Sequence, residues 1–133
     1  MNTDHLNEEE LAHLIIGKSI EIHKLIGPGL DKSCYFECMK WELEQEGINF
    51  QSDIEFDIIY KGQILEKTNN IDFIIADSVI FNMVASSEIP ESEVQRTLKI
   101  VRNNNYRLGL VINFHSTLLK NGIRRVSNNK QAN

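Results

Sequence analysis

The sequence predicts an α/β fold in which a mixed central β-sheet is flanked by α-helices. Apolar residues recur at helical spacing through the first 46 residues, and in the middle of the chain they alternate with polar residues at period two. A further helical segment then separates the middle from a second apolar run, and this order implies a mixed sheet. We expect one domain over residues 1–126 and a polar tail without fixed structure over residues 127–133.

Two helices are expected in the N-terminal third. The first should span residues 8–26, because Asn7 is a good N-cap residue, acidic side chains fill the first turn and Gly27 follows the last turn. Its main apolar face carries Leu11, Leu14, Ile15, Ile22, Leu25 and Ile26. The second helix should span residues 32–46, because Gly47 is placed to end it. Its inward face should carry Tyr35, Met39 and Leu43.

The middle of the chain is predicted to form strands. Between residues 54 and 58, apolar and acidic residues alternate, which is typical of a half-buried strand. Lys61 and Gly62 form the expected turn, after which residues 63–65 begin a returning strand. Residues 71–75 and 79–84 are almost entirely apolar. We therefore expect them to be two central strands, joined by a tight turn and covered on both faces.

One more helix and the last strands complete the expected fold. The helix should span residues 91–102, after Pro90, with Val94, Leu98 and Val101 directed inward. Residues 108–114 are expected to form another buried strand, and residues 123–126 a last short one. The expected order is therefore α-α-β-β-β-α-β, followed by this short final strand.

The composition limits the class of protein. The apolar share of 41% and the charged share of 25% are those of globular domains, which excludes disordered and fibrous chains. No apolar run approaches the ~20 residues that span a bilayer, and the first residues lack the pattern of a signal peptide, so we expect a cytoplasmic protein. The net charge of −5 opposes non-specific binding of nucleic acid, which depends on lysine and arginine.

A few side chains invite a chemical interpretation, but packing explains them better. Cys34 and Cys38 are four residues apart in the second helix, a spacing that rarely gives disulfide geometry, so we expect both thiols to be reduced and inward-facing. The histidines are scattered, which disfavours a metal role for the cysteines. Trp41 is expected to pack against the first helix, and an exposed partner surface is the alternative. Phe114 is expected in the core, with His115 on the surface.

Several short motifs form a specific combination between residues 11 and 126. They are Gly27-Pro28-Gly29-Leu30, Ser33, Tyr35, Tyr60-Lys61-Gly62, Asp72, Gln95, Leu110-Val111-Ile112-Asn113-Phe114 and Leu118-Leu119-Lys120-Asn121-Gly122-Ile123-Arg124-Arg125. In this combination the chain resembles the GxxExxR protein family, a small bacterial branch of the PD-(D/E)XK nuclease-like superfamily. The resemblance implies a PD-(D/E)XK nuclease-like α/β fold. The literal pattern Gly-x-x-Glu-x-x-Arg does not occur in the sequence.

The resemblance also implies a metal-and-carboxylate site, which this chain retains only in part. The family pattern has a Glu before the Ser of the second helix, an Asp on one strand, a Glu-x-Lys on the next and a Gln on the following helix. Such carboxylates would hold Mg²⁺, which polarises a phosphodiester and activates water. Here Asp72 and Gln95 match the pattern. Asn82 and Val84 stand at the Glu-x-Lys positions, and Lys32 stands where the pattern has the first Glu.

Periodicity independently directs the altered positions inward. Strand alternation places Asn82 and Val84 on the same face as Ile80, and helical spacing places Lys32 on the face of Tyr35. A single carboxylate beside a cation is a poor host for Mg²⁺. We therefore expect no intact catalytic set, at most a weak metal site at Asp72, and no bound cofactor.

The sequence thus favours a catalytically degenerate nuclease-like protein that serves as a binding or complex-forming scaffold. Its partner would be an unidentified protein or a second copy of the chain. One alternative is a Mg²⁺-dependent DNA or RNA nuclease whose ligands have moved to Glu66, Asp77 or Glu88. Another is a protein that binds nucleic acid without cleaving it. Such binding could use a basic stripe near the third helix, which consists of Arg96, Lys99, Arg102 and Arg107. We favour the interpretation that these side chains form an ordinary solvated helix face, and a contiguous positive surface would indicate nucleic-acid binding instead.

Overall fold

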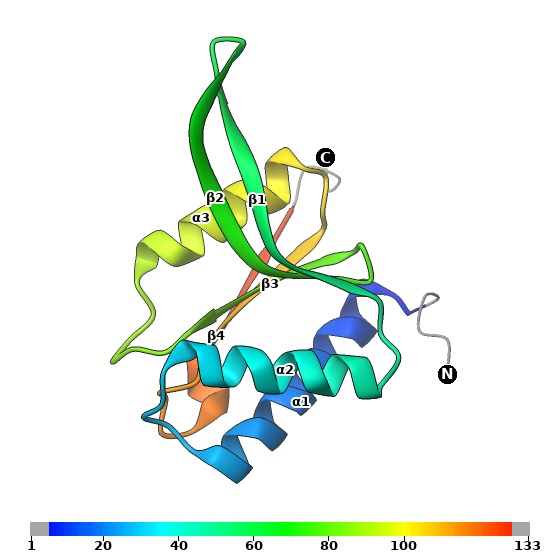
Figure 1. The fold of residues 1–133 in the computed structure, drawn as a ribbon, viewed down its shortest axis with the longest axis vertical. Coiled ribbons are helices and arrows are strands. Elements are labelled where there is room, and N and C mark those ends of the chain that lie inside the picture. The colour runs from blue at the N-terminus through cyan, green and yellow to red at the C-terminus, as the bar shows by residue number, and fades with distance from the viewer. Residues whose placement is uncertain (1–5, 129–133) are drawn as a thin grey trace.

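A mixed five-stranded sheet with helices on both faces forms the domain (Figure 1). The computed structural model describes residues 6–128, except for the side chains of residues 58 and 66–69. Its elements are α1 (Glu8–Ile26), α2 (Lys32–Gln45), β1 (Phe50–Tyr60), β2 (Gln63–Ile75), β3 (Val79–Val84), α3 (Glu91–Asn103), β4 (Leu108–Asn113), the short 3-10 helix η1 (Leu119–Gly122) and β5 (Ile123–Ser127). The predicted α/β class and the predicted mixed sheet are confirmed.

The strands lie in the order β1-β2-β3-β4-β5. Neighbouring strands are antiparallel, except that β3 and β4 run parallel. The parallel pair needs a crossover, and α3 supplies it. Every residue of β3 and of β4 is buried, as their apolar sequences predicted for strands covered on both faces.

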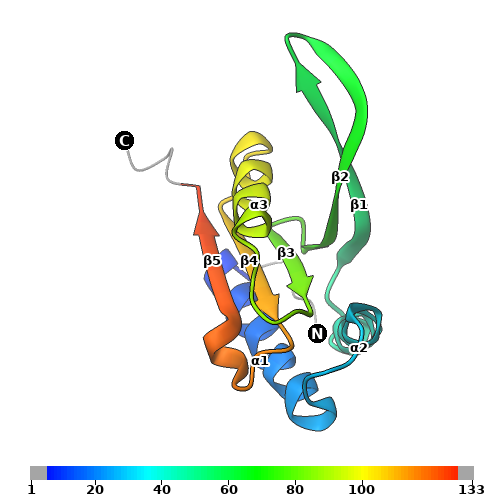
Figure 2. The same ribbon diagram turned by 90° about the vertical axis from the view of Figure 1, so that its left-hand side faces the viewer.

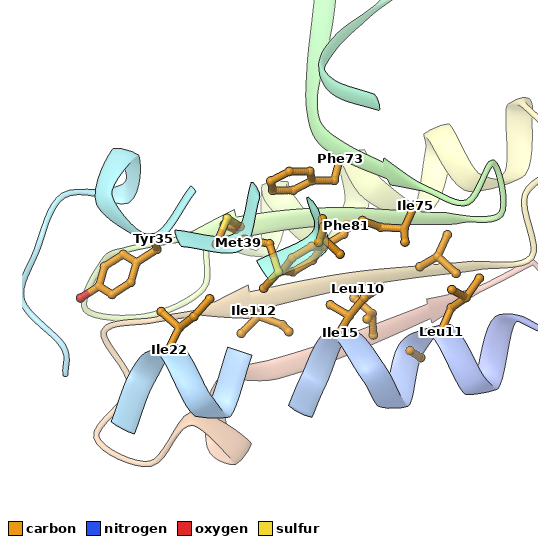
Figure 3. Close-up of a cluster of buried hydrophobic side chains, with 14 of the residues drawn as sticks. Leu11, Ile15, Ile22, Tyr35, Met39, Phe73, Ile75, Phe81, Leu110 and Ile112 are labelled. Atoms are coloured by element: carbon orange, nitrogen blue, oxygen red, sulfur yellow. The ribbon is translucent and has the colours of Figure 1, made fainter. Parts of the chain in front are cut away.

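The helices divide the core into two clusters, one on each face of the sheet. Figures 1 and 2 show α1 and α2 on one side of the sheet and α3 on the other. The larger cluster packs α1 and α2 against the sheet (Figure 3), and includes Leu11, Ile15, Ile22, Tyr35, Met39, Phe73, Ile75, Phe81, Leu110 and Ile112. The smaller cluster lies under α3 and consists of Ile71, Ile74, Ile80, Val94, Ile100, Val101 and Val126.

The first two helices begin and end as their sequences predicted. Asn7 caps α1 through a reciprocal capping box with Glu10, in which each side chain accepts from the other residue's backbone N–H. The loop after α1 needs a left-handed backbone at Gly27 and Gly29, with φ of 80° and 106°. The hydroxyl of Tyr35 donates to the carbonyl of Gly27, so the start of α2 is tied to the end of α1.

A long hairpin differs from the expected strands. Residues 63–65 and 71–75 were expected as separate segments, but both belong to the single strand β2. The residues between them are polar and gave no strand signal in the sequence; they lie where the hairpin extends beyond β3 (Figure 1). The β2–β3 ladder begins only at Phe73, which pairs with Phe81. We call the projecting part of the hairpin, residues 54–70, the arm.

Three other expectations need correction. Cys34 is exposed, although it was expected to face inward, whereas Cys38 is half-buried and packs against the larger core cluster as expected; both are free thiols. Burial raises the pKa of the Cys38 thiol, which makes it a poorer metal ligand. Trp41 is 58% exposed instead of packing fully against α1. The tail was expected to begin at residue 127, yet β5 includes Ser127; residues 129–133 lie outside the described part.

Within residues 6–128, no helix is long and apolar enough to span a bilayer.

Candidate functional site

The candidate site lies where β2 separates from β3. The last backbone pair of the β2–β3 ladder is Phe73 with Phe81. At the next position, Asp72 and Asn82, hydrogen bonds from side chains take the place of backbone pairing. The backbone N–H of Asp72 donates to Oδ1 of Asn82 over 2.9 Å, and the backbone N–H of Met83 donates to Oδ2 of Asp72 over 2.7 Å. Asp72 and Asn82 thus satisfy two backbone groups that the diverging strands would leave unpaired. Both side chains therefore have a structural task.

A cation from another layer completes the contacts of Asp72. Lys32, the first residue of α2, places its Nζ 3.0 Å from Oδ1 of Asp72. The Asp72 side chain is 13% exposed and the Lys32 side chain 47% exposed, so the ion pair closes the site on its solvent side. One carboxylate oxygen faces an ammonium group and the other accepts a backbone hydrogen bond.

The loop before α2 holds Lys32 in place. The Tyr35 hydroxyl accepts from the N–H of Leu30 over 3.2 Å while it donates to the carbonyl of Gly27. The imidazole Nε2 of His115 lies 2.7 Å from the carbonyl oxygen of Leu30. Because the Tyr35 ring is fully buried and stacks on Phe114, these contacts fix the first turn of α2 relative to the sheet.

Asn82 is tied to α3 on the opposite face. Its side chain is 1% exposed, and its Nδ2 donates to Oγ1 of Thr97 over 2.9 Å. The Thr97 hydroxyl in turn donates to the carbonyl of Glu93. Sequence reasoning missed Thr97, although its place three residues after Val94 on the buried helix face was a signal for it. The chain Asp72–Asn82–Thr97 therefore links the strand junction to α3.

The other two predicted positions have different surroundings. Val84 lies at the end of β3, is 8% exposed, and falls on the Asn82 side by strand alternation. Gln95 lies on the exposed face of α3, where its amide donates to Glu91. The structure therefore brings Asp72, Lys32 and Asn82 together, and it directs Gln95 away from them.

The candidate replacement ligands do not gather at Asp72. Asp77 lies in the exposed turn at the other end of the β2–β3 ladder, three residue pairs away. Glu88 is exposed in the loop after β3. The side chain of Glu66 lies outside the described part of the chain. Among the residues that the structure describes, no group of three or more His, Cys, Asp or Glu side chains is arranged to hold a metal ion.

These residues do not fit the Mg²⁺ ion that the family resemblance implies. Mg²⁺ prefers carboxylate and water oxygens in octahedral geometry. The Asp72 carboxylate already faces the Nζ of Lys32, and a divalent cation would be repelled by that ammonium group. Asn82 offers a neutral amide whose oxygen already accepts a hydrogen bond.

The basic stripe follows α3, so it lies on the other face of the sheet from α2. Arg96 pairs with Glu93 over 2.7 Å and also donates to the carbonyl of Asn70 on the arm. Lys99 and Arg102 are exposed on the same helix, and Arg107 is exposed just after it. These cations do not surround the Lys32–Asp72 pair.

Comparison with known proteins identifies the family of the chain. A family model described as the PD-(D/E)XK nuclease superfamily matches residues 9–126, which is nearly the whole chain. Neither the comparison with curated proteins nor that with solved structures yields a match.

Proposed function

Because the chain belongs to the PD-(D/E)XK nuclease superfamily, we propose that it is a catalytically degenerate member of GxxExxR type that acts by binding and not by hydrolysis. The observation that carries this proposal is the ion pair between Lys32 and Asp72, at 3.0 Å. A lysine ammonium takes the place beside the aspartate that a metal ion needs, and it neutralises the charge that would attract one.

The chemistry of the remaining positions supports the same proposal. Asp72 and Lys32 have a summed charge of zero, and Asn82 adds none. The aliphatic side chain of Val84 can neither transfer a proton nor stabilise a developing negative charge. Asn82 and Asp72 instead hold the strand junction together through reciprocal hydrogen bonds. Positions that are catalytic in the family pattern therefore have a structural role in this proposal, because they connect β2 to β3.

A scaffold must offer surfaces to a partner, and the described surface carries two apolar groups. One lies at the end of α1, the loop that follows it and α2, and contains Leu25, Ile26, Leu30 and Trp41. The other lies at the tip of the arm and contains Ile59, Tyr60, Ile64 and Leu65. Grouped exposed apolar side chains mark interaction sites more often than scattered ones do. They support a role in a protein complex, with an unidentified protein or with a second copy.

The test is a nuclease assay with the purified protein. We expect no cleavage of single- or double-stranded DNA or RNA with Mg²⁺ or Mn²⁺. Cleavage that persists through purification and is abolished by Asp72→Ala would overturn the proposal, because a contaminating nuclease would not respond to that substitution. The same result would support the alternative of a nuclease with rearranged ligands.

A second candidate function is the binding of nucleic acid without cleavage. Lys99 and Arg102 are exposed on α3 and have no ion-pair partner among the described residues, so they are available to phosphate groups. Fluorescence anisotropy with labelled oligonucleotides tests this function. Binding that weakens with salt and is lost on Lys99→Glu with Arg102→Glu would support it, whereas binding that is insensitive to both would exclude this surface.

A further inference from the structure

A small apolar groove lies between α1 and α2 at the surface, and we call it the α1–α2 groove. Leu25 is 80% exposed and Trp41 is 58% exposed, so its apolar rim faces solvent. Exposed apolar side chains that gather at one hollow mark a binding site more often than scattered ones do. The groove is lined by Ile22, Leu25 and Ile26 of α1 and by Cys38, Trp41 and Glu42 of α2.

The size of the groove limits the kind of contact that it can make. Its volume is about 160 Å³, whereas pockets for small-molecule ligands typically enclose ~300–1,000 Å³. A hollow of this size accommodates one large apolar side chain, and such anchor side chains dominate the affinity of many protein interfaces. Two helices that line a groove also form a common receptor for the apolar face of a third helix.

Two carboxylates lie directly beside the groove. Glu42 is part of its lining. Burial is the main cause that raises the pKa of the Cys38 thiol, and the charges of Glu42 and Glu37 raise it further, so both carboxylates are close to this lining residue. Glu37 has no ion-pair partner among residues 6–128, so its charge is available to a cation of a partner.

Further carboxylates extend this acidic rim along both helices. Glu44 follows Trp41 by three residues and Glu21 precedes Leu25 by four. At these spacings each glutamate shares a helix face with its exposed apolar neighbour. Glu44, like Glu37, has no ion-pair partner in the described part of the chain.

Lysines do not neutralise the acidic rim. Lys24 and Lys40 precede Leu25 and Trp41 in the sequence, and the helical rotation of about 100° per residue turns them toward the flanks of the groove. Even when both are counted with Lys18, five glutamates against three lysines leave a net charge of −2. Lys18 is itself shared among three of these glutamates, which are Glu21, Glu42 and Glu46.

This negative charge decides among the possible occupants of the groove. A second copy would bring two acidic rims together, and like charges that face each other across an interface cost affinity. Nucleic acid and the anionic surface of a bilayer would be repelled for the same reason. A segment that carries lysine and arginine beside an apolar face has the complementary charge.

We propose that the α1–α2 groove binds a basic amphipathic helix of a partner protein. One large apolar side chain of that helix enters the hollow beside Leu25 and Trp41, and flanking lysine or arginine side chains pair with Glu37 and Glu44. This inference rests on the proposed function, because a scaffold needs a partner, and it adds the chemistry of that partner.

Trp41 is the only tryptophan of the chain, so its fluorescence reports directly on the groove. The probe is a synthetic peptide without tryptophan, of roughly 18 residues, which is long enough to form a helix, with leucine at helical spacing and lysine elsewhere. Micromolar peptide should shift the emission of Trp41 to shorter wavelengths in a saturable manner, because the indole ring leaves water. The same peptide with glutamate in place of lysine should give no shift.

Charge variants locate the contact on the acidic rim. Glu37→Lys with Glu44→Lys should weaken binding of the lysine peptide roughly tenfold or more, because both substitutions repel it. The matched control is Glu55→Lys with Asp57→Lys on the arm, which makes the same change in net charge and should leave binding unchanged. All four side chains are exposed, so both variants should keep the fold, which circular dichroism verifies.

An apolar variant locates the contact in the hollow. Leu25→Gln should also weaken binding of the lysine peptide roughly tenfold, because it removes an apolar wall of the groove and leaves Trp41 in place. Ile64→Gln, at a similarly exposed position on the arm, is its control and should bind as the parent chain does.

Three results would overturn the inference. The first is no saturable shift with the lysine peptide, or an equal shift with the glutamate peptide. The second is equal binding by the groove variants and their arm controls. The third is an emission that shifts with protein concentration alone, which would assign the groove to a second copy. None of these results bears on hydrolysis or metal binding at Asp72, so failure of this inference is distinct from failure of the proposed function.

Discussion

At the scale of single residues, the strand junction depends on side chains that replace backbone pairing. The Asn82 side chain accepts a hydrogen bond from the backbone N–H of Asp72 on β2, and the Asp72 side chain accepts one from the backbone N–H of Met83 on β3. Asn82 also donates to Thr97. An amide serves this role better than a carboxylate, because it both accepts and donates, whereas an ionised carboxylate only accepts. This double role gives a physical reason for an asparagine at this position.

Asn82→Ala should therefore destabilise the protein by about 1–3 kcal/mol, because it leaves the buried N–H of Asp72 and the Thr97 oxygen without their partner. Urea unfolding measures the loss. Asn103→Ala, at the exposed end of α3, is the control and should stay within about 0.5 kcal/mol of the parent chain. Equal effects of the two substitutions would show that the Asn82 hydrogen bonds contribute nothing measurable.

Restoring the family pattern should restore metal binding. In the triple variant Lys32→Glu, Asn82→Glu and Val84→Lys, three carboxylates would surround the position that the ammonium group now occupies. An ion bound only by the native state must raise its stability, so Mg²⁺ or Mn²⁺ should raise the Tm of the variant in a saturable manner. Asn82→Glu alone should give no response, because Lys32 still faces Asp72. A folded triple variant without a metal response would show that these positions do not converge.

At the scale of elements, α3 packs closely against the sheet over Gly109. A Cβ at this position would lie 2.8 Å from a methyl group of Val126 and 2.9 Å from methyl groups of Thr97 and Val101. All three neighbours are β-branched and so have little rotameric freedom to move aside. A glycine in β4 thus sets the distance between the sheet and the helix that carries Thr97.

Gly109→Ala should destabilise the protein by about 1–3 kcal/mol through overpacking. Gly17→Ala is the matched control, because Gly17 lies within α1 and its added Cβ would meet no atom within 4 Å. This control should stabilise the protein by about 0.5–1 kcal/mol, since alanine favours a helix over glycine. Thermal denaturation of the two variants compares them. A neutral Gly109→Ala would mean that α3 can shift freely on the sheet.

Lys18 joins α1 to α2 and gives a prediction about pH. Its Nζ lies 2.9 Å from Glu46 and 3.2 Å from Glu42, and the hydrogen bond to Glu46 is the main cause that raises the pKa of Lys18 above 10.5. A raised pKa in the folded state means that this stabilisation is fully present below the unfolded pKa and is lost as pH rises through the folded value.

Lys18→Met should thus be less stable than the parent chain by about 0.5–1 kcal/mol near pH 7. The difference should shrink toward zero as the pH rises above the pKa of Lys18 in the folded state, where the side chain has lost its proton in both states. Urea unfolding of both proteins below and above this pKa measures it, and the comparison cancels the titration of other groups. A difference that is constant with pH would assign the effect to packing of the lysine stem.

At the scale of the whole molecule, elements with strong periodicity were predictable and positions on helix faces were less so. The three helices and the buried strands β3 and β4 agree with their predicted ranges within about two residues. Cys34 and Trp41 were misplaced, because a helix turns about 100° per residue and periodicity alone does not fix which flank of the apolar stripe meets the sheet. The hairpin turn and both its strands were predicted, but the continuity of β2 was missed, because the polar residues between its two predicted segments gave no strand signal.

The residues of the candidate site were likewise predicted only in part. Sequence reasoning selected Asp72, Asn82 and Lys32, and in the structure Asp72 contacts both of the others. It also selected Gln95, which the structure places on the exposed face of α3. The reciprocal bonds of Asp72 and Asn82 arise only where β2 leaves β3, and no local pattern marks that point, because it is set by how far the ladder extends.

The central claim for the molecule is that a lysine from α2 occupies the place of a metal ion between the helical layer and the sheet. The measurement that tests it most directly is calorimetric titration of the unmodified chain with Mg²⁺ and Mn²⁺, next to the Asp72→Asn variant. We predict no saturable heat for either protein at millimolar ion concentrations. A saturable site in the unmodified chain that disappears in Asp72→Asn would contradict the claim, because it would show that Asp72 binds a metal ion despite Lys32.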